Sequence, residues 1–261
     1  MTAVLIALAS LFLAQDTVNT MPTNRSVAAD LRDNGVRIET ERATLLFQPD
    51  QLSAEEMERF AGLVDEGIGY LQEYLGVTPS DRRVQYFVSD RIATSYSNGR
   101  SVFLPLSRVK DHSAPYLHES SHVLAPCHDC PMWFSEGLAS YVQSWVSENR
   151  GGYDGVIFAR RGNRGIDRDA VRWLNGERGQ AVLPFIGRHG EPPAISYDRS
   201  NVAAPFYVMS QSFVKYLVDR AGMEKVRLLI GTGDFEVQMV EATGKSSEQW
   251  KAEWLASLAA L

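Results

Sequence analysis

Apolar positions in residues 53–75 recur at steps of three and four, which is the spacing of one face of a helix. The series consists of Met57, Phe60, Val64, Ile68, Leu71 and Leu75. Ser53 followed by Glu56 is typical of a capping box at the start of a helix, and Gly76 favours its end. The pattern therefore predicts an amphipathic helix with one buried side.

Short runs of apolar and β-branched residues flank this helix. Residues 43–47 and 84–88 read as strands, and Ser101–Pro105 follows an Asn-Gly turn signal and reads as another. Because proline has no N–H to donate within a sheet, Pro105 favours an exposed edge for the last of these strands.

Helical patterns dominate the second half of the chain. Helices are predicted at 116–124 and 132–147, and again at 204–221, 223–229 and 247–261. Residues 149–200 are rich in Gly, Arg and Asp, so loops and short helices are expected there. Strands and one helix come first and mostly helices follow. This order predicts an α+β fold.

The chain begins with an apolar segment, residues 4–14, interrupted by Ser10. It is shorter than the roughly 20 residues of a membrane span. It fits a signal peptide over residues 1–14, and the alternative is a short buried helix. We therefore expect a secreted or periplasmic protein, with a cytoplasmic location left open. A flexible leader is expected over 15–36.

Length and charge narrow the class of protein. The 261 residues suit one domain over 37–261, with an N-lobe of about 37–130 and a helical C-lobe of about 131–261. The net charge is -6 and no dense basic stripe occurs, which argues against nucleic acid as the main partner. No segment predicts a stable membrane span. The oligomeric state stays open.

The predicted helix at 116–124 contains His118-Glu119-Ser120-Ser121-His122. A helix turns about 100° per residue, so His122 returns nearly above His118 and both imidazoles can reach one ion. Zinc accepts imidazole nitrogen in a tetrahedral site. Glu119 lies beside the first ligand, where it can take a proton from a water that the metal activates.

A catalytic zinc site needs a third protein ligand, and Glu136 is the candidate. It lies in the apolar start of the next predicted helix, where an unpaired carboxylate would be costly. Two histidines and one glutamate leave a fourth position open, as catalysis requires. We therefore expect one Zn2+ per chain, held by His118, His122 and Glu136.

The two motifs together resemble the gluzincin zinc metallopeptidases, in particular the peptidase MA-like branch. The resemblance lies in His-Glu-x-x-His followed by Trp-Phe-x-Glu-Gly-Leu-Ala at residues 133–139. It implies a thermolysin-like zincin architecture, with a small mixed sheet and active-site helix before a mainly helical lobe. It also implies a peptide or protein substrate, paired in extended form with Ser101–Pro105. The absence of a Gly-x-Met-Glu-Asn segment, which would bind a free amino terminus, favours an endopeptidase or an unusual substrate, and the choice between endopeptidase and exopeptidase stays open.

The resemblance carries residue roles as well. It implies that His118, His122 and Glu136 bind zinc and that Glu119 is general base and later acid. It further implies a donor that stabilises the oxyanion from a later helix. Tyr207 is the candidate, in a Tyr-x-x-x-Gln-Ser pattern, and its alternative role is packing.

His189 is a second and weaker candidate for the oxyanion donor, and its alternative role is that of a surface histidine.

Better-known gluzincins carry an aspartate four residues after the glutamate ligand, where it holds a ligand histidine. This chain has Ser140 there, which accepts an imidazole N–H less strongly.

Cys127 and Cys130 are the two cysteines of the chain. A structural disulfide is favoured, and a redox role or half of a metal site is the alternative. Three functions follow: a zinc hydrolase that cleaves peptide bonds, a catalytically silent zinc-containing binding protein of the same fold, or a redox protein. The intact Glu119 favours the first over the second. The open coordination position argues against the third.

Overall fold

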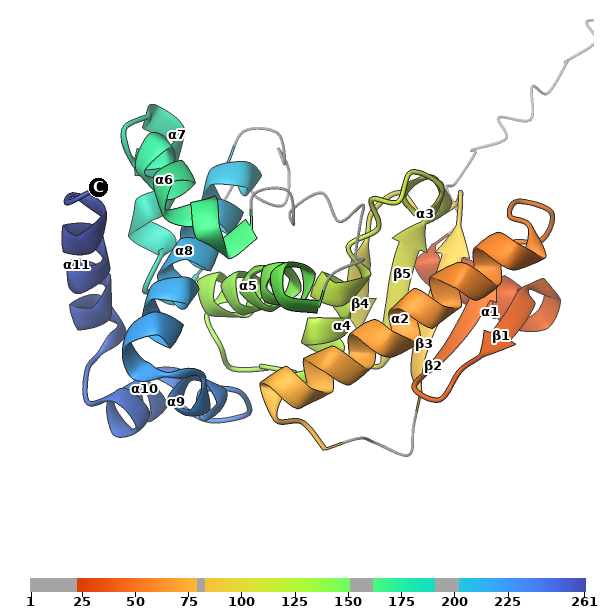
Figure 1. Ribbon diagram of the computed structural model, residues 1–261, viewed down its shortest axis with the longest axis horizontal. Helices are drawn as coiled ribbons and strands as arrows, with labels where there is room; N and C mark the ends of the chain where they lie inside the picture. Colours follow the sequence, from red (N-terminus) through yellow and green to blue (C-terminus); the bar gives the residue numbers. More distant parts are fainter. Residues whose placement is uncertain (1–22, 79–82, 151–161, 191–201) are drawn as a thin grey trace, which may run out of the picture.

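A computed structural model describes the chain in four stretches, at residues 23–78, 83–150, 162–190 and 202–261. The predicted signal peptide, residues 1–14, and the first part of the predicted leader lie outside the described residues. Within the described stretches, a small sheet comes first and a helical lobe follows (Figure 1). The α+β prediction is confirmed.

One mixed sheet of five strands is formed in the described residues, in the order β1-β2-β3-β5-β4. The strands are β1 (Val36–Glu39), β2 (Ala43–Phe47), β3 (Val84–Ser89), β4 (Tyr96–Asn98) and β5 (Ser101–Pro105). β2, β3 and β5 are parallel, and β1 and β4 run antiparallel to their neighbours. In this register, Tyr86 lies between Leu45 and Val102.

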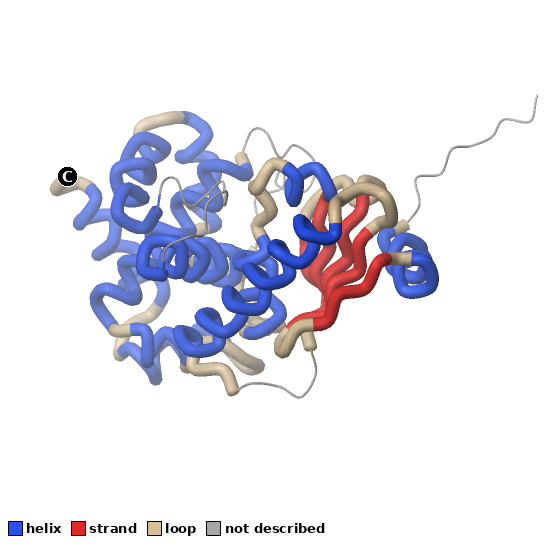
Figure 2. The backbone as a smooth tube through the Cα atoms, turned by 45° about the vertical axis from the view of Figure 1, so that its right-hand side comes forward, coloured by secondary structure: helices blue, strands red, loops and turns tan. Residues whose placement is uncertain are grey.

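Helices cover both faces of the sheet (Figure 2). α2 (Ala54–Leu75) packs on the face that carries Leu45, Tyr86 and Val102. Its predicted boundaries are confirmed: Ser53 and Glu56 form the capping box, and Gly76 ends the helix at φ 65°. The left-handed conformation at this position favours glycine, because it has no Cβ to clash.

The other face of the sheet is covered by α1 (Asn24–Asn34). The prediction of a flexible leader over 15–36 is therefore wrong for this segment. Thr23 caps the helix, and Val27, Ala28 and Leu31 form a short apolar side. That side packs on the apolar side chains that β2, β3 and β5 present to it.

The prediction that Ser101–Pro105 forms an exposed edge is also wrong. β5 lies between β3 and β4, and β4 is the outer strand. The Asn-Gly turn, with Gly99 at φ 57°, reverses the chain so that β4 pairs along β5. Pro105 is the last residue of β5. Its lack of an N–H therefore leaves the pairing of the earlier β5 residues with β3 intact.

Helices form the rest of the described chain. They are α3 (Leu106–Lys110), α4 (Tyr116–Leu124), α5 (Met132–Arg150), α6 (Gly162–Leu174), α7 (Glu177–Val182), η1 (Leu183–Phe185), α8 (Ala203–Ala221), α9 (Met223–Arg227), α10 (Phe235–Thr243) and α11 (Ser247–Leu258). Short helices were expected within 149–200, and α6, α7 and η1 are the described part of that stretch. No helix of the described residues is long and apolar enough to cross a membrane.

α5 occupies the middle of the molecule, between the sheet with α4 and the helical lobe (Figure 1). It approaches α8 closely at Gly137, where a Cβ would lie 2.6 Å from the carbonyl oxygen of Ser210. Trp133 stacks on Phe213, which packs in turn against Trp254. These contacts fix the start of α5, and with it the position of the residues that follow.

Candidate metal centre

α4 presents His118 and His122 from one side because its other side is anchored to the sheet. Ser120 hydrogen-bonds the hydroxyl of Tyr86 on β3, and Leu117 is fully buried. The two histidines lie one helical turn apart and face α5. The predicted arrangement of both imidazoles on one face is present.

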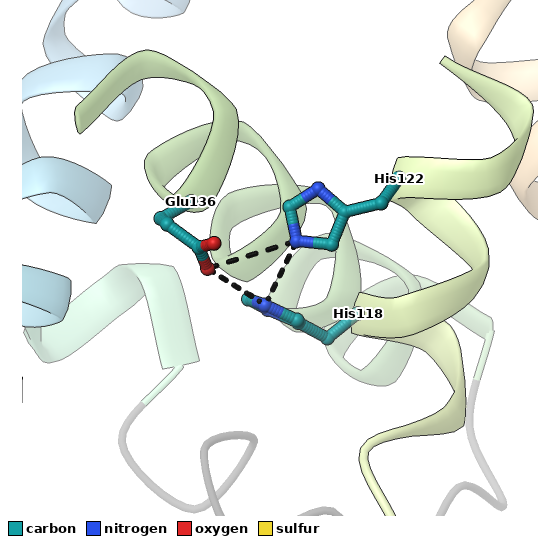
Figure 3. A group of neighbouring side chains, drawn as sticks. All are labelled: His118, His122 and Glu136. Atoms are coloured by element: carbon teal, nitrogen blue, oxygen red, sulfur yellow. Dashed lines mark hydrogen bonds and ion pairs between the residues drawn. The ribbon is translucent and has the colours of Figure 1, made fainter. Parts of the chain in front are cut away.

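α5 brings Glu136 to these histidines (Figure 3). Its Oε2 lies 3.0 Å from Nε2 of His118 and 3.6 Å from Nε2 of His122. The two Nε2 atoms are 3.2 Å apart. A tetrahedral zinc ion with bonds of about 2.0–2.1 Å holds its ligand atoms about 3.3–3.4 Å from each other. The three atoms are therefore spaced as ligands of one small cation would be, and this group can hold a metal ion.

Serine hydroxyls lie at the other nitrogen of each imidazole. Ser140 Oγ is 3.4 Å from Nδ1 of His118, and Ser135 Oγ is 3.2 Å from Nδ1 of His122. A hydroxyl that accepts the Nδ1–H leaves the lone pair of Nε2 available for a metal. Ser140 was expected here. Ser135 was not, although its place directly before Glu136 was the available signal.

The three side chains are coupled electrostatically. Burial alone would raise the pKa of Glu136, but hydrogen bonds to both imidazoles and their charges lower it well below its usual range. Burial opposes the charge of His122, yet the hydrogen bond to Glu136 and the charges of Glu136 and Glu119 raise the pKa of His122. The carboxylate of Glu136 thus has both imidazoles as its close partners, and the positive partner that the sequence predicts for it, a zinc ion, stays a prediction.

Glu119 lies on α4 next to the first histidine and is 7% exposed. Burial raises the pKa of its carboxyl, although the charges of His118 and His122 act in the opposite direction. A carboxylate that is more basic than usual is a better proton acceptor. Glu119 is not one of the three residues of the metal group.

Tyr207 projects from α8 toward the metal group. Its ring lies 6.1 Å from that of His118, in an edge-to-face arrangement. His189, the weaker rival, is exposed, and its ring contacts Phe235, 6.4 Å away, on α10. The structure therefore brings the first candidate to the site and directs the second to another contact.

Cys127 and Cys130 are joined by a disulfide in the loop between α4 and α5. Their Sγ atoms lie 3.5 and 3.4 Å from the carbonyl oxygen of Leu229. Asp129, in the same loop, accepts a hydrogen bond from the N–H of Gly233 at 3.0 Å. The loop that connects α4 and α5, the two helices that carry the candidate metal group, is therefore attached to the C-terminal lobe.

Comparison of the chain with protein-family models, with curated proteins and with solved structures finds no match. Because none of the three comparisons finds a match, the chain is described by its own fold and its own candidate site. The chain is an α+β protein with a buried group of two histidines and one glutamate that can hold a metal ion.

Proposed function

We propose that this chain is a zinc-dependent hydrolase of the gluzincin type, which cleaves peptide bonds. The convergence of His118, His122 and Glu136 from two helices carries the proposal. Two imidazole nitrogens and one carboxylate oxygen form a donor set that suits zinc, and one zinc per chain is expected. Three protein ligands leave a position open for water or substrate.

The order of elements supports a thermolysin-like zincin architecture for this protein. A small mixed sheet is followed by the helix that carries both histidines, then by the helix that carries the glutamate, and then by a helical lobe. This is the order that the resemblance to gluzincins implies.

When bound, zinc supplies Lewis-acid polarisation of the scissile carbonyl and lowers the pKa of a water. Glu119 accepts the proton of the attacking water and returns it to the leaving amine. The environment that raises the pKa of this carboxyl favours that role. Tyr207, beside His118, donates its hydroxyl hydrogen bond to the oxyanion.

The substrate in this proposal is a peptide or protein in extended form. β5 is an inner strand, so the peptide pairs with the outer edge of β4 instead. α4 packs against both β4 and β5, which places this edge near the histidine helix. Export to the periplasm or the medium is part of the proposal, and the Cys127–Cys130 disulfide accords with an oxidising compartment.

Glu119→Gln tests the proposal against a catalytically silent zinc protein of the same fold. The zinc-loaded wild type is expected to cleave members of a quenched-fluorescent peptide library. Loss of a general base typically lowers the rate by about 10²–10⁴-fold, and the variant should keep its zinc. Glu224→Gln, an exposed position on α9, is the matched control and should keep both zinc and activity.

Two results would overturn the hydrolase. One is equal cleavage by Glu119→Gln and wild type, which would place the activity elsewhere. The other is a zinc-loaded wild type that cleaves no member of a library that covers all residue types around the scissile bond. That second outcome would favour the silent binding protein.

A further inference from the structure

Arg108 lies on α3, the short helix that joins the end of β5 to the loop before the histidine helix α4. Its carbonyl oxygen accepts a hydrogen bond from the N–H of Ser113 at 2.8 Å, which folds this loop back on α3. The carbonyl oxygen of Pro115, at the end of the loop, accepts the N–H of Glu119 at 3.0 Å. Backbone contacts therefore connect Arg108 to the start of α4, where Glu119 lies.

The side chain of Arg108 is half-buried and has no partner within the described part of the chain. Leu106 and Val109 hold α3 on the core, and Arg108 is more exposed than either. Its guanidinium takes part in none of the ion pairs or side-chain hydrogen bonds formed among the described residues. An arginine stays charged in proteins and offers five N–H donors. These donors are consequently available to an acceptor from outside the chain.

The charge of Arg108 reaches the candidate catalytic centre. Burial raises the pKa of the Glu119 carboxyl, and the charges of His118 and His122 oppose this effect. The charge of Arg108 acts in the same direction as those of the histidines. The carboxylates of Glu119 and Glu136 balance the charge of one bound zinc dication, so Arg108 gives the loaded centre a net positive charge. A centre of this charge attracts anionic groups of a substrate.

The sheet edge proposed for the substrate leads toward the same helix. β4 is the outer strand, and its first residue, Tyr96, lies opposite Phe103 of β5. β5 ends at Pro105, and α3 begins at the next residue. An extended peptide on the outer edge of β4 therefore has one end directed toward α3.

We infer that Arg108 determines specificity by binding a carboxylate of the peptide close to the scissile bond. The inference rests on the proposed function, because a peptide is the ligand. A guanidinium donates two parallel hydrogen bonds to one carboxylate, which a neutral amide cannot match. The carboxylate belongs either to an acidic side chain or to the carboxyl terminus of the peptide. The first source makes the protein an endopeptidase selective for acidic residues, and the second makes it a carboxypeptidase.

The selectivity of the zinc-loaded wild type tests the inference without any variant. One set of peptides carries Glu or Gln at each position near a bond that the wild type cleaves. A second set ends shortly after that bond, with a free carboxyl or with an amide. We expect kcat/KM to be about tenfold or more higher for the carboxylate in one of the two sets. The set that shows the preference identifies the source, and equal kcat/KM within every pair would overturn the inference.

Arg108→Gln should remove this preference. Lys110→Gln is the matched control, because it removes a positive charge from an exposed position on the same helix, where Lys110 contacts Gln51 at 3.5 Å. It should keep the preference, and circular dichroism checks that both variants are folded. An unchanged preference in folded Arg108→Gln would overturn the inference. Equal losses on both peptides of a pair would also overturn it, and would assign Arg108 to the support of Glu119.

Peptide binding to the zinc-loaded Glu119→Gln protein gives a readout apart from turnover. Fluorescence anisotropy uses labelled peptide pools that differ only in the carboxylate. The pool with the carboxylate should bind about tenfold more tightly, and adding Arg108→Gln should remove the difference. Cleavage by the wild type without a carboxylate preference would refute the role of Arg108 alone. Preferential binding that depends on Arg108, in a protein that cleaves nothing, would refute the hydrolase and support the carboxylate site.

Discussion

Ser140 Oγ lies 3.4 Å from Nδ1 of His118, while Nε2 of the same ring faces Glu136 at 3.0 Å. The imidazole is thus held at one nitrogen and directed toward the metal position by the other. A neutral hydroxyl occupies the place where a carboxylate would hold the ring more strongly. Ser135 makes the equivalent contact with His122.

Ser140→Ala and Ser135→Ala should each weaken zinc binding by about tenfold, because loss of such supporting contacts typically costs 10–100-fold in metal affinity. Competition with a chromogenic chelator measures the affinity. The double variant should be weaker than either single variant, since each serine supports a different histidine.

Ser144→Ala is the control for the serine variants. Ser144 is buried on the same helix, but it accepts a hydrogen bond from Gln211 and supports no metal ligand. It should alter stability while leaving zinc affinity unchanged. Equal zinc affinities in all three single variants and the wild type would show that the serines do not orient the ligands.

Local patterns were sufficient to predict several elements and the metal group. The period of α2 and its capping residues give its bounds directly, because helix geometry repeats within a few residues. The spacing of His118 and His122 fixes their common face for the same reason. Glu136 was predictable because a carboxylate in an apolar helix start demands a cationic partner.

Other features depend on contacts distant in sequence. α1 has only three strongly buried apolar residues, and it packs only because the sheet offers a second apolar face. β4 has the sequence Tyr-Ser-Asn, with no apolar run, and becomes a strand through its pairing with β5. Ser135 lies on α5 and His122 on α4, so their contact depends on the path of the loop that joins the two helices, which the sequence does not specify.

Tyr207→Phe separates an oxyanion donor from a packing residue. Removing one donor of this kind costs about 10²–10³-fold in kcat. We expect a loss of this order, with zinc content unchanged. Tyr216→Phe, on the same helix and packed against Trp250, should retain full activity. Unchanged kcat in Tyr207→Phe would assign this tyrosine to packing alone.

Replacing both Cys127 and Cys130 by serine should lower the free energy of unfolding by about 2 kcal/mol, since the disulfide closes only a short loop. Denaturant unfolding measures the change. Zinc content and hydrolysis should persist. A redox protein would behave differently: the wild type would catalyse thiol–disulfide exchange, and the folded serine variant would lose that activity.

Asp65 provides a test of pH dependence away from the metal. Burial opposes its charge, but hydrogen bonds from Thr40 and Arg42 and the charge of Arg42 lower the pKa of Asp65. Its stabilising contribution is therefore present above the unfolded pKa of about 3.9 and is lost as the pH falls through the folded value.

Asp65→Asn should accordingly lower the free energy of unfolding by about 1–3 kcal/mol at neutral pH. The difference from wild type should shrink as the pH falls below about 4. Denaturant unfolding at several pH values measures it. Asp33→Asn, at an exposed position on α1, serves as the comparison. A difference that stays constant with pH would contradict this assignment.

The central claim is that His118, His122 and Glu136 form one zinc site. Elemental analysis of the purified protein, beside a folded Glu136→Ala variant, tests it most directly. We predict one zinc per wild-type chain and loss or strong weakening of zinc binding in the variant. No zinc in the wild type after incubation with the metal, or equal zinc in both proteins, would contradict the account.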